Sequence, residues 1–240
     1  MMKYLAAICF ILLTFTVHAQ TKPTIKQDLL SPVNTDASSY FWTGTALTSF
    51  LVITQDYISY PLTERAYETR PLGDAAKVGD LYGQLYPNII YTLGALAHGY
   101  YSQEDKSSYE KADHMFRATL YSGFVVTVLK YTIREPRPNS SHEKNSFPSG
   151  HSTTAFAFAT VVATEHSWKW GVPAMALAAL TGFSRMNDER HFLHDVIAGM
   201  TLGVSYGLGT YYTKNGQDNK MIFVPILDQE RAGLRLVTTF

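Results

Sequence analysis

Residues 147–164 read FPSGHSTTAFAFATVVAT, a polar turn that leads directly into an apolar run from Thr153 to Thr164. An apolar run of this length favours a helix over a strand. Ser149 or Ser152 can cap the start of that helix, and Gly150 lets the backbone approach a bound group closely. Since a capped helix start presents free backbone amides to anions, this stretch predicts both a buried helix and an anion site at its first turn.

Five further apolar segments flank this one, and the breaks between them contain glycine, proline and charged residues. They cover residues 40–60, 85–101, 115–133, 172–183 and 196–212. Their lengths predict an all-α, single-domain bundle of about six core helices. Glycine and alanine suit close helix packing in water or in lipid, so whether the helices span a bilayer stays open, with a membrane-associated protein favoured. A mean hydropathy of −0.07 is low for six membrane spans.

The two ends of the chain differ from the apolar segments. Lys3, an apolar run over residues 4–17 and a small residue at Ala19 predict a secretory signal peptide over residues 1–19; the alternative is a retained anchor, for which the run is short. We expect a lead-in over residues 20–37, the folded domain over 38–213, and an extended strand or hairpin over 214–240, where β-branched residues occur with proline and glycine.

Composition limits the classes of function. The chain has 20 basic and 20 acidic residues, so no overall field attracts nucleic acid, and any anion site must use a few placed cations. Cys9, the one cysteine, lies in the predicted signal peptide, which excludes disulfides and thiolate chemistry from the mature chain. The signal peptide predicts export to the cell envelope, to the periplasm or to a membrane-associated position.

Reactive residues gather in three stretches, each beside prolines, glycines or helix ends. The first is KYTIREPRP at residues 130–138, the second is FPSGHS at 147–152, and the third is SRMNDERHFLHD at 184–195. Their order and internal spacing resemble the three-part signature of the type 2 phosphatidic acid phosphatase (PAP2) superfamily, which also includes bacterial acid phosphatases and vanadium haloperoxidases. The matching positions are Lys130, Arg137, Pro138, Pro148, Ser149, Gly150, His151, Ser184, Arg185, His191 and Asp195.

The cations in these stretches suit a phosphate group without reference to any family. Arg137 and Arg185 can each offer a planar fork to two oxygens, and Lys130 supplies a point charge. Ser149 can donate its hydroxyl, and Gly150 leaves the backbone amides accessible. Taken singly, Lys130 and Arg137 would be ordinary cations at a helix end. Together with Arg185 they would repel one another in an empty site, which favours a bound oxyanion.

The histidines suit proton transfer and nucleophilic attack. His151 can protonate a leaving alkoxide, although it also fits a surface position after a plain helix cap. His191 and Asp195 are four residues apart, which would place them on one helical face, so that Asp195 can hold one ring nitrogen and leave the other free to attack. The alternative is an exposed ion pair. We expect His194 to face elsewhere and to be structural, and Arg134 and Arg190 to be ordinary surface charges.

The resemblance implies an all-α phosphatase that forms a phosphohistidine. It assigns His191 as nucleophile, Asp195 as the residue that orients it, His151 as general acid and base, and the cations with Ser149 and Gly150 as the phosphate cradle. No cofactor and no metal are expected, because no His-Glu-x-x-His or EF-hand spacing is present and the cations would oppose a metal ion. Vanadate is expected to inhibit.

Two other functions stay open on the same scaffold. One is a vanadium haloperoxidase, in which vanadate would be the cofactor, and the other is a non-catalytic envelope protein. The substrate could be a phosphorylated lipid, a lipid diphosphate or a small soluble monoester. Trp42, Trp168 and Trp170 indicate either contact with lipid or ordinary core aromatics.

Overall fold

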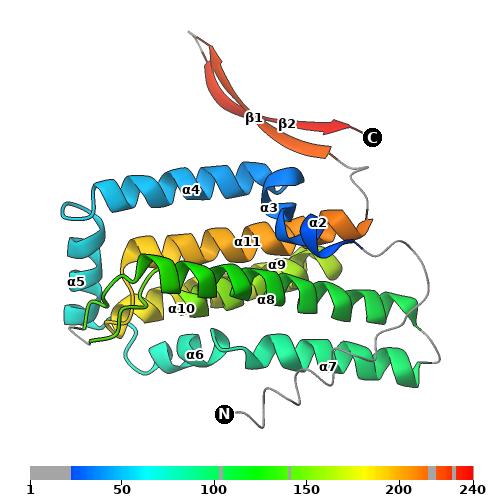
Figure 1. Ribbon diagram of the computed structural model, residues 1–240, viewed down its shortest axis with the longest axis horizontal. Coiled ribbons are helices and arrows are strands. Elements are labelled where there is room, and N and C mark those ends of the chain that lie inside the picture. Colours follow the sequence, from blue (N-terminus) through cyan, green and yellow to red (C-terminus); the bar gives the residue numbers. More distant parts are fainter. Residues whose placement is uncertain (1–22, 103–104, 140–141, 216–219, 229–230, 240) are drawn as a thin grey trace.

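The computed structural model describes residues 23–102, 105–139, 142–215, 220–228 and 231–239, with side chains up to residue 215. Six long helices lie alongside one another and α5 lies across one end of them (Figure 1). The elements are α2 (Ile25–Leu29), α3 (Ser31–Asn34), α4 (Ser38–Ile53), α5 (Ser59–Thr69), α6 (Ala75–Tyr82), α7 (Tyr86–Tyr101), α8 (Lys106–Ile133), α9 (Gly150–Glu165), α10 (Trp168–Asn187), α11 (Leu193–Asn215), β1 (Lys220–Asp228) and β2 (Arg231–Thr239).

The six long helices correspond to the six predicted apolar segments, so the all-α bundle is confirmed. The predicted extended C-terminal segment is an antiparallel hairpin of β1 and β2. Helix α8 begins earlier than the apolar run does, because the Asp105 side chain accepts a hydrogen bond from the Ser107 amide and caps it. The helix ends at Ile133, and its C-cap residue Arg134 has a left-handed φ of 55°. The predicted signal peptide, residues 1–19, lies outside the described residues.

Helices α9 and α11 approach each other more closely than residues with a Cβ would allow, because glycines of α11 face the backbone of α9. A Cβ on Gly199 would lie 2.5 Å from the Ser149 carbonyl oxygen, and one on Gly203 would lie 2.5 Å from the Thr153 carbonyl oxygen. Glycines spaced four residues apart allow this approach between helices. The contact places the start of α9, which carries the PSGH stretch, against the start of α11.

The described part of the predicted lead-in, residues 23–37, contains two short helices that pack on the bundle. Helices α2 and α3 pack on α11, and the buried Asp28 of α2 accepts a hydrogen bond of 2.7 Å from Arg117 Nε on α8. Thr213 on α11 donates to the same carboxylate. The polar residues of this segment thus tie the N-terminal helices to the bundle.

Replacing Asp28 by alanine is expected to lower the free energy of unfolding by about 3–5 kcal/mol, because it leaves the Arg117 guanidinium buried without its carboxylate. Denaturant unfolding monitored by circular dichroism measures the change. The matched control is Asp74→Ala, which removes an exposed ion pair with Lys77 and should leave the midpoint unchanged. Equal midpoints for Asp28→Ala and the parent would contradict the structural role of the buried pair.

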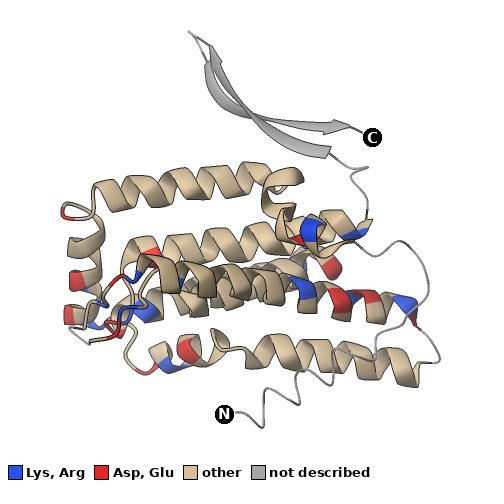
Figure 2. Ribbon diagram, in the orientation of Figure 1, with Lys and Arg blue, Asp and Glu red and all other residues tan. Residues whose placement is uncertain are grey.

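Charge and apolar surface are segregated. Figure 2 shows charged residues gathered towards the ends of the bundle, while α4 and α7 have none. Large apolar side chains are exposed on these helices and on α8, including Phe50, Ile53, Ile90, Leu93, Phe124 and Tyr131. Trp42, Trp168 and Trp170 are also exposed, so they are not core aromatics. Among the described residues, no helix combines the length and the apolarity that a membrane span requires.

Candidate active site

The first stretch places two cations beside the loop that precedes α9. Lys130, in the last turn of α8, donates to the carbonyl oxygens of Asn145 and, at 3.3 Å, Ser146. Arg137 Nε donates to Asn145 Oδ1 at 2.7 Å and lies 3.1 Å from the Glu143 carboxylate. Burial, together with the charge of Arg137, lowers the pKa of Lys130 to about 8. The two predicted phosphate-binding cations of this stretch therefore lie close together, in a partly buried position.

The second stretch forms the N-terminus of α9 as the sequence predicted. Ser149 is the N-cap, and its Oγ accepts hydrogen bonds from the Ser152 amide and hydroxyl, which leaves its own hydroxyl proton for another acceptor. A Cβ on Gly150 would have only Val126 Cγ1 nearby, at 3.9 Å, so the backbone there borders open space. His151, in the first turn, lines a cavity of about 460 Å³ with Gly83, Leu85, Gly123, Val126 and other residues.

His151 and Arg185 both face a carboxylate that the sequence did not point to. Asp80, on α6, accepts a hydrogen bond from Arg185 Nη1 and lies 3.4 Å from His151 Nε2. Arg185 Nε is buried and has no hydrogen-bond partner among the described residues, so this N–H remains available to an oxyanion. Burial and then the charge of Arg185 lower the pKa of His151 to about 4, against the effect of Asp80.

His191 lies in the loop before α11, because the helix begins only at Leu193. The prediction that His191 and Asp195 share a helical face is therefore wrong in detail, but the two side chains do meet. His191 Nδ1 is 3.4 Å from Asp195 Oδ2. Asp195 Oδ2 also accepts hydrogen bonds from the Phe192 amide at 2.8 Å and from Ser146 Oγ at 2.6 Å. These contacts fold the loop back over the start of α11.

The pair is buried, which excludes the exposed ion pair that the sequence left open. His191 is 2% exposed and Asp195 is 0% exposed. Burial lowers the pKa of His191 to about 4, although Asp195 acts to raise it. Burial alone would raise the pKa of Asp195, but the hydrogen bond and charge of His191 hold it at about 2. At neutral pH a neutral imidazole therefore faces an ionised carboxylate through Nδ1, and Nε2 points away from it.

The three stretches converge on one site. The charges of Arg185, His191 and Arg137 all lower the pKa of His151, and those of Lys130 and Arg137 lower that of His191. The charge of Arg185 also acts on Arg137. Two imidazoles and three cations are thus within electrostatic reach of one another. Such a set can hold an oxyanion, attack it from a histidine nitrogen and supply a proton.

Five further residues near this site were missed or misread in the sequence. Ser146 holds Asp195, and Glu135 accepts a hydrogen bond of 2.9 Å from His194 Nε2, so His194 faces the site instead of pointing elsewhere. Glu135 lies within the first reactive stretch and Ser146 lies next to the second, and this position in the sequence could have identified both residues. No feature of the sequence pointed to Asp80, since 105 residues separate it from Arg185. Arg190, expected to be an ordinary surface charge, lines a polar recess of about 270 Å³ with Arg70, Asp80, Arg185 and Asp188.

Comparisons with known proteins agree with the three stretches. The family model of the PAP2 superfamily matches residues 114–218. The lipid A 1-phosphatase of Porphyromonas gingivalis is 36% identical over 88 residues, which are 35% of this chain and 20% of that protein. The lipid A 1-phosphatase of Rhizobium johnstonii is 32% identical over 111 residues, which are 40% of this chain and 45% of that protein. The chain thus spans less than half the length of these two curated relatives.

A solved structure shares the fold. The crystal structure of Aquifex aeolicus LpxE superposes with a TM-score of 0.54 at 24% sequence identity, and the match covers 64% of this chain and 94% of that one. At this identity the likeness concerns the arrangement of helices. It supports the helical bundle as the scaffold that brings the three stretches together.

Proposed function

We propose that this chain, whose residues 114–218 match the family model of the PAP2 superfamily, is a metal-independent phosphatase that hydrolyses the phosphomonoester of a lipid phosphate through a phosphohistidine. The observation that carries this proposal is the buried His191–Asp195 pair within electrostatic reach of Lys130 and Arg137. A neutral imidazole, oriented by a carboxylate and facing fixed cations, is suited to attack phosphorus.

In the proposed reaction the phosphoryl oxygens bind to Lys130, Arg137 and Arg185, with the Ser149 hydroxyl and the amides at the start of α9. His191 Nε2 attacks phosphorus in line, and the bond from phosphorus to the alkoxide oxygen breaks. The cations stabilise the charge on the equatorial oxygens, which supplies most of the rate in phosphoryl transfer.

Proton transfer follows from the positions of the two histidines. His151 donates a proton to the departing oxygen and then accepts one from the water that hydrolyses the phosphohistidine. The pKa of His151 is lowered to about 4 in the free protein, chiefly by burial. A bound phosphate dianion beside the ring favours the protonated form and raises this pKa. Asp195 stabilises the positive charge that grows on His191, and phosphate leaves with His191 restored.

A lipid phosphate is the substrate class that we propose, and the 1-phosphate of lipid A is the first candidate. The two curated relatives are lipid A 1-phosphatases. The exposed apolar side chains of α4, α7 and α8 support an association with a lipid surface, since exposed apolar patches of this kind mark interaction sites. Export to the cell envelope remains part of the proposal.

Phosphate release from a panel of substrates tests this function. The purified full chain is incubated in detergent with lipid A, phosphatidic acid, phosphatidylglycerol phosphate, undecaprenyl diphosphate and p-nitrophenyl phosphate. Each substrate is assayed with chelator alone and, in a separate reaction, with added vanadate. We expect release from a lipid phosphate in chelator and inhibition by vanadate. Release only after metal addition, or no release from any substrate, would contradict the proposal. Peroxide-dependent oxidation of halide in the presence of vanadate would support a haloperoxidase instead.

A further inference from the structure

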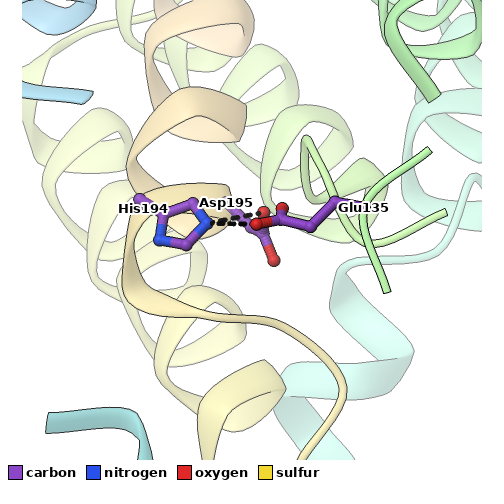
Figure 3. Close-up of side chains that lie close together, drawn as sticks. All are labelled: Glu135, His194 and Asp195. Carbon is purple, nitrogen blue, oxygen red and sulfur yellow. Dashed lines mark hydrogen bonds and ion pairs between the residues drawn. The ribbon is translucent and has the colours of Figure 1, made fainter. Parts of the chain in front are cut away.

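Glu135, His194 and Asp195 form a buried group beside the proposed nucleophile, and the proposed mechanism leaves the first two unused. His194 Nε2 lies 2.9 Å from Glu135 Oε1 and 3.6 Å from Asp195 Oδ1. Figure 3 shows both carboxyl groups facing this one ring nitrogen. The imidazole stacks against Phe192, with ring centroids 5.4 Å apart, so the orientation of the ring is fixed by packing.

Two oxygen atoms in this group lack a donor. Glu135 Oε2 and Asp195 Oδ1 are buried and have no hydrogen-bond partner among the described residues. If both carboxyls were ionised, both atoms would be acceptors only, and leaving them buried and unpaired would be costly. A proton on Glu135 removes the conflict, because its hydroxyl can then donate to Asp195. Burial raises the pKa of Glu135, and the negative charge of Asp195 raises it further.

One arrangement of protons satisfies every atom of the group. The His194 amide donates to Ser59 Oγ at 3.2 Å, which leaves the Ser59 proton for His194 Nδ1, 2.8 Å away. His194 Nε2–H then donates to Glu135 Oε1. Glu135 and Asp195 are close enough to share a hydrogen bond that raises the pKa of Glu135 and lowers that of Asp195, so a proton on Glu135 Oε2 can be donated to the Asp195 carboxylate. Burial lowers the pKa of His194, but the hydrogen bond to Glu135 and the nearby carboxylates raise it. A second proton on His194 in place of that on Glu135 would leave both orphaned oxygens without a donor.

We propose that Glu135 is a protonated positioning residue, held by His194, that fixes the Asp195 carboxylate for the nucleophile. With Oδ1 engaged by Glu135, and Oδ2 by Ser146 and the Phe192 amide, the carboxylate cannot rotate away from His191 Nδ1. Hydrogen bonds to the ionised form also keep the pKa of Asp195 low. The inference rests on the proposed function, since Glu135 acts on the reaction only through Asp195.

A bound cation is the other explanation for the two orphaned oxygens. The ligand atoms of Glu135, His194 and Asp195 lie within 4.8 Å of one another. Lys130 interacts electrostatically with both carboxyl groups, so its positive charge opposes a second cation between them. A proton needs no further ligands and no added space, so we favour it. The two explanations make opposite predictions for an amide in place of Glu135. An amide can donate a hydrogen bond as a protonated carboxyl does, but it lacks the negative charge that would hold a cation.

Glu135→Gln and Glu135→Ala separate these cases. The amide of Gln can accept from His194 through its oxygen and donate to Asp195 through its nitrogen, so it keeps the whole chain of hydrogen bonds. We expect Glu135→Ala to lower kcat by about 10–100-fold, with KM little changed, by analogy with the loss of a hydrogen-bond partner that orients a metal-binding histidine or carboxylate. Glu135→Gln should restore most of that kcat. Glu110→Ala, on the exposed part of α8 with Lys106, is the control for loss of a carboxylate.

Failure of this inference can be told apart from failure of the proposed function. Infrared spectroscopy detects a protonated carboxylic acid without any turnover, and its carbonyl band should be present at neutral pH in the parent and absent in Glu135→Gln. Absence of that band in the parent, or a Glu135→Gln variant as impaired as Glu135→Ala, would overturn the proposal. Circular dichroism of each variant shows that a lost kcat is not a lost fold. A parent that shows the band yet releases no phosphate would contradict the proposed function alone.

Discussion

Replacing His191 by alanine is expected to lower kcat by about 10⁵- to 10⁶-fold, the loss that removal of a nucleophile produces when the catalytic residues act as a unit. The structure places this side chain in a buried position, 2% exposed, with Nδ1 facing Asp195. No neighbouring group in the proposed mechanism can replace its attacking nitrogen. Stopped assays of phosphate release from the preferred lipid measure the effect.

The control for this variant is His98→Ala. His98 is an exposed histidine near the C-terminus of α7 that pairs with Ser108 and Asp105, outside the site, so its loss should leave kcat unchanged. The folded state of His191→Ala is checked by its thermal midpoint, because a buried side chain has been removed. A folded His191→Ala protein that retains near-normal turnover would show that another group attacks phosphorus.

Replacing Asp195 by asparagine is expected to lower kcat by about 10³- to 10⁴-fold. In the proposed mechanism the carboxylate accepts the proton of His191 Nδ1, which leaves Nε2 with its lone pair for attack. An asparagine amide can instead donate to Nδ1, which favours the tautomer with the proton on Nε2. The side chain then has nearly the same shape, but the nitrogen that should attack carries a proton.

The pH dependence of Asp195→Asn distinguishes a wrong tautomer from a shifted pKa. Burial lowers the pKa of His191 to about 4, so protonation of His191 should reduce the activity of the parent as the pH falls through about that value. Asp195 is among the groups that raise this pKa, so its neutralisation lowers the pKa further. The loss in Asp195→Asn should therefore persist at every higher pH. Recovery of activity at alkaline pH would contradict the tautomer explanation.

The helices were predictable from the sequence because apolar runs of this length favour a helix over a strand. The PSGH stretch gave the start of α9 correctly, since Ser149 caps the helix through its own side chain. The start of α11 was placed wrongly. The Asp195 side chain accepts a hydrogen bond from the Phe192 amide, and with this local contact the helix begins after His191, at Leu193. The apolar pattern of the sequence does not predict such a contact.

The part of the site that the sequence did not reveal depends on tertiary contacts. Asp80 reaches Arg185 only because α6 packs against α10. His194 was expected to face away because it neighbours Asp195 in the chain. At the first turn of α11, however, its ring turns towards Glu135, whose loop follows α8. Adjacent residues at a helix end can thus serve one site, which helical periodicity within a continuous helix does not predict.

Trapping of the covalent intermediate tests the account most directly. In His151→Ala, p-nitrophenyl phosphate can still phosphorylate His191 because its leaving group needs no proton, but the water that hydrolyses the intermediate lacks its base. After an alkaline quench, mass spectrometry of the digested protein should find the phosphoryl group on His191. A phosphoryl group on a different residue, or burst-free turnover in which no residue becomes phosphorylated, would contradict the account.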